Sequence, residues 1–311
     1  MQNTIMSHTV VKNLVDSWPK RAGVRSNDYY MQNSATEYDE NIPDYPIEML
    51  PFHNHPKFID TIPKQQQEIL TWAWLVYNER VVIAEEHVAN PTLTMIIQGV
   101  FPGTTNYFYQ QALRQCLIDE HFHTLIHVTA IHETKKLRNI NTELHSPPSI
   151  IYRKLLENQA QVSETWQKDL LTLVWTVVSE ISINAYLNLL STNNCIQPMH
   201  KTVTWLHNRD EFVHSSILLE ITKSVYIHLN SEKKRFFISA LPKAINAFAA
   251  HDFSSWYAIL KQVGIEGYSE IIRDCEANTA NGKLFRDFSG LKRLVEELDI
   301  ISEIDFKFTD I

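Results

Sequence analysis

Four glutamates interrupt four long, otherwise apolar segments of the chain. Glu85 lies in VVIAEEHV, Glu120 in CLIDEHFH, Glu180 in VWTVVSEISI and Glu211 in HNRDEFVH. A charged carboxylate that faces a protein core costs several kcal/mol unless it is paired or bound to a metal. Four such residues in four successive segments need a common explanation.

The composition predicts that these segments are helices. The chain has only 7 glycines in 311 residues, and a β-rich or dinucleotide-binding fold would use more of them in its turns and phosphate loops. We therefore expect an all-α fold. The long helices are predicted to begin at Pro63 and run toward Asn90, with a break or kink at Pro91, and then to cover 106–137, 164–191 and 200–229. Shorter helices are expected at 149–160 and toward the C-terminus, the last near 283–298.

Residues 1–60 have a different character. They are rich in Asn, Asp, Tyr and Pro and show no sustained helical period, which predicts a mostly irregular N-terminal arm. The helical pattern begins near residue 61. We therefore expect one ferritin-like domain over 61–311, a four-helix bundle with additional C-terminal helices.

Charge and cysteine content narrow the setting of the protein. A net charge of −8 argues against a nucleic-acid partner, which would require clustered Lys and Arg. Three widely spaced cysteines form no disulfide framework. The N-terminus lacks an apolar signal region, and the most apolar stretch, 170–178, is too short to cross a bilayer. A soluble cytoplasmic protein without a membrane partner is expected.

Two histidines give the glutamates a chemical meaning. His123 follows Glu120 at i+3, and His214 follows Glu211 at i+3, so each pair lies on one helical face. The order Glu, ExxH, Glu, ExxH, with one element per long helix, is the ligand scheme of ferritin-like dinuclear carboxylate proteins. The spacings of 35 and 31 positions within the two pairs suit antiparallel helix hairpins, and the 60 positions from Glu120 to Glu180 leave room for a long crossover. Two metal ions are therefore predicted, and the mixed carboxylate and imidazole donors favour iron or manganese.

Other residues compete for places at this site. His207 precedes Glu211 by four positions and shares its stripe, which makes it a seventh ligand candidate. His127 shares the face of Glu120, but we expect it to surround the site rather than bind metal. Glu86, the next residue in the chain, is the alternative to Glu85 as the first ligand. Asp210 points away from the Glu211 face and is expected to be solvated.

The set Glu85, Glu120-x2-His123, Glu180, His207-x3-Glu211-x2-His214 resembles that of the p-aminobenzoate N-oxygenase type of diiron oxygenases, over about residues 70–290. The extra histidine on the last ligand helix, here His207, is typical of that family. The resemblance implies two iron ions, O2 as co-substrate, and oxidation of a small primary amine to a hydroxylamine and onward to nitroso or nitro. It also implies a peroxo-diiron(III) intermediate, an external reductase or ferredoxin, and a homodimer.

The resemblance also suggests substrate contacts. Tyr77 lies two helical turns before Glu85, and Asn184 lies one turn after Glu180, so both should flank the metals. Arg286 is similar to an arginine that anchors the carboxylate of an aryl amine. The amine itself stays open: it is aromatic or aliphatic, and free or carried on another protein.

Two other functions use the same ligand pattern. A dinuclear Fe/Fe or Mn/Fe site could hydroxylate or oxidise C–H bonds, which metal analysis and a product screen would reveal. A ferritin-like iron-binding protein is the non-catalytic alternative. The large predicted C-terminal layer argues for an enclosed organic pocket instead.

Overall fold

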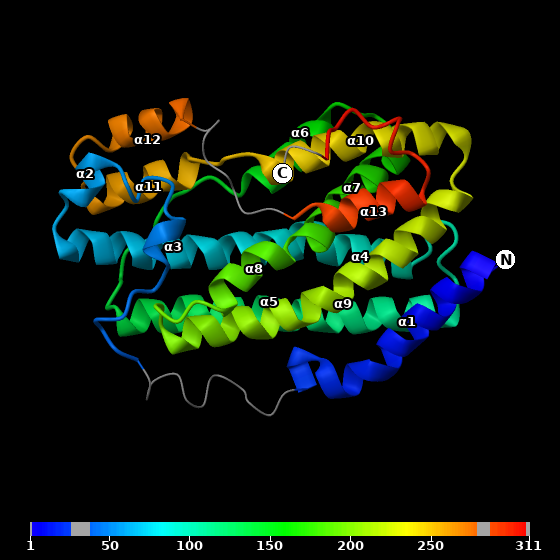
Figure 1. The fold of residues 1–311 in the computed structure, drawn as a ribbon, viewed down its shortest axis with the longest axis horizontal. Coiled ribbons are helices and arrows are strands. Elements are labelled where there is room, and N and C mark those ends of the chain that lie inside the picture. Colours follow the sequence, from blue (N-terminus) through cyan, green and yellow to red (C-terminus); the bar gives the residue numbers. More distant parts are fainter. Residues whose placement is uncertain (1, 26–37, 279–286, 309–311) are drawn as a thin grey trace.

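The described part of the chain consists of helices joined by turns and loops (Figure 1). The computed structural model describes residues 2–25, 38–278 and 287–308. No β-strand occurs within these ranges. The all-α fold predicted from the scarcity of glycine is confirmed.

Four long helices form the core bundle. They are α3 (Pro63–Ala84), α5 (Tyr107–Leu137), α7 (Thr165–Ser182) and α9 (Pro198–His228). Their starts match the sequence signals, because Pro occupies the first turn of α3 and α9 and the Asn106 side chain accepts the backbone N–H of Phe108 and Tyr109. Helix α3 packs against α5, α5 against α9, and α9 against α7. This is the expected ferritin-like arrangement.

A π-helical turn interrupts the first bundle helix at Glu85, the metal ligand predicted for this helix. The turn η4 (Glu85–Ala89) lies between α3 and α4 (Asn90–Ile97), and the backbone N–H of Asn90 bonds to the carbonyl of Glu85. Pro91 explains the break, since its ring lacks an N–H and collides with the carbonyl four residues earlier in an α-helix. The wider turn absorbs this conflict. Both η4 and α4 contact α7, which closes the ring of bundle helices.

The third bundle helix also divides near Glu180, its predicted metal ligand. The predicted helix at 164–191 consists of α7 and α8 (Asn184–Ser191), with Ile183 at the break. Helix α8 packs along α9. The division occurs within one turn of Glu180 and places Asn184 at the start of the new helix.

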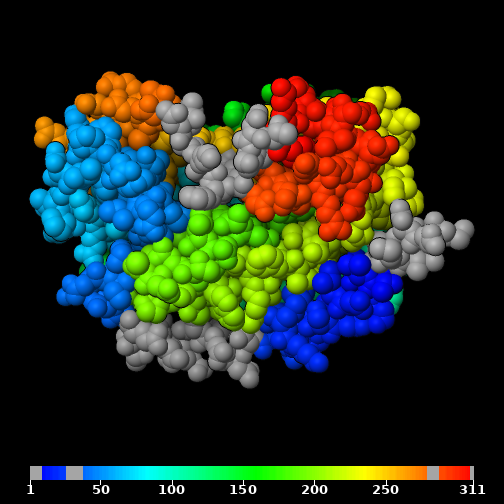
Figure 2. All heavy atoms as spheres, viewed as in Figure 1, coloured from blue at the N-terminus to red at the C-terminus, as the bar shows by residue number. Residues whose placement is uncertain are grey.

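The N-terminal segment differs from the predicted irregular arm. Helix α1 (Gln2–Arg21) and the short helix η1 (Gly23–Arg25) lie against α5 and α9, at the lower right of Figures 1 and 2. Among the described apolar side chains of α1, only Val11 and Val15 are buried. The helix therefore depends on packing against the bundle, and its own sequence lacks a strong apolar stripe. Farther on lie two short helices, η3 (Ile47–Met49) and α2 (Pro56–Ile59).

The remaining helices cover the top of the bundle in Figure 1. Helix α6 (Ile150–Ala160) lies in the crossover between α5 and α7 and packs against α7 and α10 (Ser231–Ala249). The later ones are α11 (Ser254–Val263), α12 (Tyr268–Ala277) and α13 (Ser289–Glu297). Figure 2 shows α13 and the segment after it (red) forming a raised block on the surface.

The bundle holds two apolar cores with a polar layer between them. Along α5, residues up to Cys116 belong to the first core, and residues from Phe122 onward belong to the second. Along α9 the order is reversed, with the second core up to Leu206 and the first from Ile217. Around these limits the two helices carry buried polar side chains that form the polar layer, among them Glu120 and His123 on α5 and His207, Glu211 and His214 on α9.

One helical stretch of the described chain, Thr165–Ser191, is long and apolar enough to span a membrane by length and composition. Its most apolar window is 72% buried within the protein. Most of this stretch, which comprises α7 and α8, therefore packs against other helices of the bundle.

Candidate metal centre

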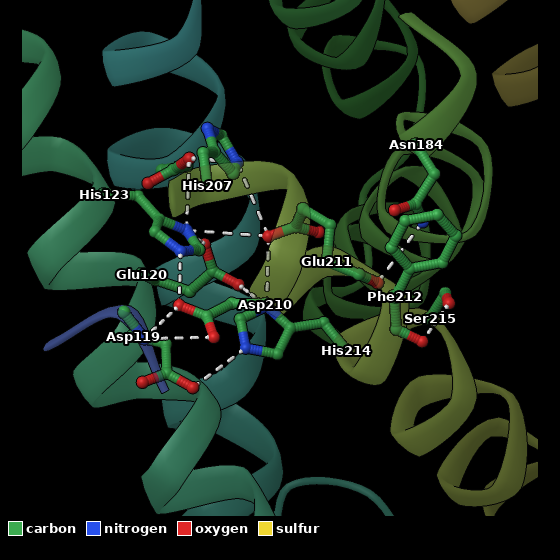
Figure 3. A network of polar contacts seen from close by, with 12 residues as sticks. Asp119, Glu120, His123, Asn184, His207, Asp210, Glu211, Phe212, His214 and Ser215 are labelled. Carbon is green, nitrogen blue, oxygen red and sulfur yellow. Dashed lines mark hydrogen bonds and ion pairs between the residues drawn. The ribbon is translucent and has the colours of Figure 1, made fainter. Parts of the chain in front are cut away.

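The polar layer contains all seven ligand residues that the sequence predicts. Each of them is at most 7% exposed, and they come from η4, α5, α7 and α9; Figure 3 shows the five that lie on α5 and α9. They are Glu85, Glu120, His123, Glu180, His207, Glu211 and His214. Donor atoms from distant parts of the chain thus face one buried space.

One group of donors comprises the two ExxH pairs. Atom Nδ1 of His214 lies 2.8 Å from Glu120 Oε1 and 3.1 Å from Glu211 Oε1. Atom Nδ1 of His123 lies 3.2 Å from Glu120 Oε2 and 3.5 Å from Glu211 Oε1. One donor atom from each of the four residues falls within 4.8 Å of the others, a spacing that could hold a metal ion.

A second group shares His123 with the first. It consists of Glu85, His123 and His207, again with donor atoms within 4.8 Å of one another. Atom Nε2 of His207 lies 3.3 Å from Glu85 Oε1 and 3.4 Å from Glu211 Oε1. The His123 and His207 rings stack with centroids 4.2 Å apart.

Glu180, on α7, belongs to neither of these two donor groups. Burial raises its pKa well above the usual value, and the charges of Glu211 and Glu120 add to this effect. Its Oε2 atom and the Oε2 atom of Glu211 are buried without a hydrogen-bond partner. A buried carboxylate oxygen without a partner carries a large desolvation cost, which a bound cation would offset.

The electrostatics of the layer favour positive charge. Burial, followed by the charge of Glu120, raises the pKa of Glu85 well above its usual value. Burial alone would lower the pKa of His123, but hydrogen bonds to Asp210 and Glu120 hold it well above the usual value. The layer therefore resists more negative charge and attracts cations.

Two aspartates support the ExxH histidines from the opposite helix. Asp119 on α5 accepts the Nε2–H of His214 on α9 at 3.2 Å, and Asp210 on α9 accepts the Nε2–H of His123 on α5 at 3.4 Å. Both aspartates are fully buried. The expectation that Asp210 is solvated is therefore wrong, because its side chain reaches across to α5. The repeated Asp-Glu-x2-His pattern was the available sequence signal for this pair.

His207 is held by a chain of hydrogen bonds between uncharged side chains, which runs from Asn78 through His127. The Asn78 amide donates from Nδ2 to the Trp74 carbonyl at 2.6 Å, so its Oδ1 is left to accept the Nδ1–H of His127 at 2.6 Å. The Nε2 atom of His127 must then accept the Nδ1–H of His207 at 2.9 Å. This fixes the tautomer of His207, whose Nε2 lone pair is directed at Glu85 and Glu211. The expectation that His127 surrounds the site agrees with this geometry.

The predicted substrate contacts lie near the layer. Tyr77 is buried, and its hydroxyl has no hydrogen-bond partner. Its ring and that of His127 pack in a T-shaped arrangement with centroids 5.9 Å apart. Asn184 donates from Nδ2 to the main-chain carbonyl of Glu211 at 3.3 Å, and its Oδ1 is buried without a partner (Figure 3). Arg286 lies outside the described residues. Glu86 is exposed, whereas Glu85 is buried.

Comparison with known proteins agrees with this geometry. Residues 6–299 match the family model described as P-aminobenzoate N-oxygenase AurF. A curated relative, the 4-aminobenzoate N-oxygenase of Streptomyces thioluteus, is 39% identical over 297 residues, which cover 96% of this chain and 88% of the relative. The match includes α1 as well as the bundle and α13. The chain belongs to the p-aminobenzoate N-oxygenase family.

Proposed function

We propose that the polar layer binds two iron ions. Glu85, His123 and His207 would hold the first, and Glu180 and His214 would hold the second. Glu120 and Glu211 would supply carboxylate oxygens to the same centre. The two donor groups, which share His123, support two ions rather than one. The partnerless oxygens of Glu180 and Glu211 are further donors for the second ion.

The donor set suits iron. Four carboxylates offset the four positive charges of two ferrous ions, so the loaded centre is near neutral in a low-dielectric core. Oxygen and imidazole donors with no thiolate favour iron or manganese over softer metals. Asp119, Asp210 and His127 each accept a ring N–H, which leaves the other nitrogen of each ligand histidine free for metal.

We propose that the protein N-oxygenates a small primary amine. Family membership carries this assignment, together with the third histidine and its fixed tautomer. When bound, the two ferrous ions supply the reduction of O2. One oxygen atom goes to the amine nitrogen to give a hydroxylamine, and the other leaves as water with two electrons and two protons. No flavin or nicotinamide fingerprint occurs in the sequence, so the electrons come from a separate reductase or ferredoxin.

The substrate is proposed to be an aryl amine that carries a carboxylate, as the relative's name indicates for that protein. The Tyr77 hydroxyl and the Asn184 amide oxygen are buried and partnerless, so they can orient the amine by hydrogen bonds without first losing other partners. Arg286 would pair with the carboxylate. A cytoplasmic location and a homodimer complete the proposal.

Replacement of one shared ligand tests the proposal. Glu120→Ala should lose iron and amine N-oxygenation together, because both ions lose a carboxylate. Iron per chain and the hydroxylamine product are the two measurements. Glu86→Ala is the matched control, since Glu86 is an exposed glutamate beside a ligand and its loss should change neither. A Glu120→Ala protein that keeps both iron and product formation contradicts the assignment.

A further inference from the structure

The segment 18–23, at the end of α1 and the start of η1, contacts both Asp119 and Asp210. The indole N–H of Trp18 donates to Asp119, 2.9 Å from each carboxylate oxygen. Five residues later, the backbone N–H of Gly23 donates to Asp210 at 2.9 and 3.2 Å. The Arg21 guanidinium adds a contact to Asp210 at 3.4 Å. Asp119 and Asp210 are 0% exposed, so each aspartate joins a group of the N-terminal segment to a histidine in the interior of the protein.

The two sets of contacts form parallel chains. One runs from Trp18 through Asp119 to His214, and the other runs from Gly23 through Asp210 to His123. Each begins on the N-terminal segment and ends on a histidine whose Nδ1 faces the polar layer. The segment 18–23 therefore spans both halves of the centre.

Gly23 is required by space rather than by backbone conformation. A methyl group at this position would lie 2.7 Å from Asp210 Oδ2 and 3.2 Å from Phe122 Cε1. Gly23 is not among the described residues with positive φ, so an alanine could adopt its backbone. The close approach lets a main-chain N–H reach a buried carboxylate.

We propose that Trp18 and Gly23 are positioning residues that set the metal affinity of the two halves of the centre separately. Trp18 fixes Asp119 and thereby the His214 ring, and Gly23 fixes Asp210 and thereby the His123 ring. Groups that orient ligand histidines typically change metal affinity by 10–100-fold. The N-terminal segment is thus part of the metal centre. This inference rests on the proposed two-iron site.

Two conservative substitutions test the proposal. Trp18→Phe keeps an aromatic ring but removes the N–H. Gly23→Ala adds one methyl group that displaces Asp210. Each should weaken one of two metal-binding steps about tenfold in anaerobic Fe(II) or Co(II) titrations and leave the other step unchanged. Lys12→Ala is the control, since Lys12 is an exposed residue of α1 whose ion pair with Asp16 is on the surface.

A spectroscopic measurement separates positioning from simple loss of stability. In the Co(II)-loaded protein, the ring N–H protons of His123 and His214 should give NMR signals shifted by the metal. These protons should exchange slowly with solvent, because each is hydrogen-bonded to a buried aspartate. Trp18→Phe should speed the exchange of the His214 proton, and Gly23→Ala that of the His123 proton. Circular dichroism checks that each variant is folded.

The outcomes distinguish this inference from the proposed function. If wild-type protein binds no pair of ions, the proposed function fails first. If wild-type protein binds two ions and Asp119→Asn weakens one of them, the centre is correct. Trp18→Phe and Gly23→Ala variants with two unchanged affinities and unchanged exchange would then overturn the positioning role, even if their melting temperatures fall.

Discussion

At the residue scale, the three histidines present different ring nitrogens to the centre. His123 and His214 face it with Nδ1 and donate from Nε2 to aspartates. His207 faces it with Nε2 and donates from Nδ1 to neutral His127, whose pKa burial lowers well below the usual value. A carboxylate partner increases the basicity of a ligand histidine more than a neutral imidazole does. His207 is therefore the weakest nitrogen donor of the three.

We predict that His127→Phe selectively weakens the first iron ion. The phenyl ring fills similar space but accepts no hydrogen bond, so the Nδ1–H of His207 loses its partner and the ring its fixed tautomer. Iron affinity at that ion should fall about tenfold, as measured by anaerobic titration, and the second ion should bind as before. His132→Phe on the exposed face of the same helix serves as control. Two unchanged affinities in His127→Phe would show that this chain of hydrogen bonds does not support His207.

The sequence predicted the residues of the layer but not all of its connections. Helical order and spacing identified Glu85, Glu120, Glu180 and Glu211, since carboxylates in apolar segments are costly without a common partner. The expectation from the helical pattern that Asp210 is solvated was wrong. A helical wheel gives the direction of a side chain from its own axis, and it does not say whether a neighbouring helix brings a partner there.

At the element scale, local signals predicted the helices better than their interruptions. Helix α5 starts next to Asn106, where a helix was expected to start, and α9 starts at Pro198, two residues before the expected position. The π turn at Glu85–Ala89 was visible only as a kink expected at Pro91. Helix α1 was missed because its stability comes from contacts with α5 and α9, which lie about a hundred residues away or more.

Hydrogen bonds of His200 connect three helices of the bundle and the segment that contains Asp44. His200 on α9 donates from Nδ1 to the Asp44 carbonyl at 3.0 Å and accepts the Thr134 hydroxyl of α5 at Nε2. The Thr134 oxygen in turn accepts the Trp74 N–H of α3. Burial lowers the pKa of His200 to about 4. A proton at Nε2 would face the Thr134 oxygen and break this arrangement.

We predict that acid weakens the fold through His200. Its pKa is lower in the folded state than in the unfolded chain, so only the unfolded chain gains a proton between pH 6.5 and about 4. The free energy of unfolding should fall by about 3 kcal/mol over this window because of this residue. Urea unfolding at a series of pH values measures it. His200→Gln should be less stable than the wild-type protein at pH 7, but its free energy of unfolding should fall less on acidification. Equal pH dependence of this free energy in both proteins would contradict the prediction.

At the scale of the whole molecule, the polar layer divides the interior into two apolar cores. The polar layer interrupts hydrophobic packing across four helices, and its buried carboxylates are costly without positive charge. A ligand that binds only the folded state stabilises it by mass action. Metal binding should therefore be coupled to the stability of the whole bundle.

We predict that anaerobic Fe(II) raises the melting temperature by several degrees, since a ligand at a hundred times its Kd adds about 2.7 kcal/mol. Glu180→Ala should bind only the first ion and show a smaller rise. Calorimetry with and without a chelator measures both shifts. An equal rise in Glu180→Ala would remove Glu180 from the ligand set.

The contacts of Trp18 and Gly23 also concern the order in which the protein is made. Their partners Asp119 and Asp210 follow 101 and 187 residues later in the chain. On the ribosome, this segment emerges before α5 and α9, so its contacts with Asp119 and Asp210 can form only after α9 has been synthesised. An extension fused directly to the N-terminus would burden this late docking step, so a C-terminal fusion is the better choice for producing the iron-loaded protein.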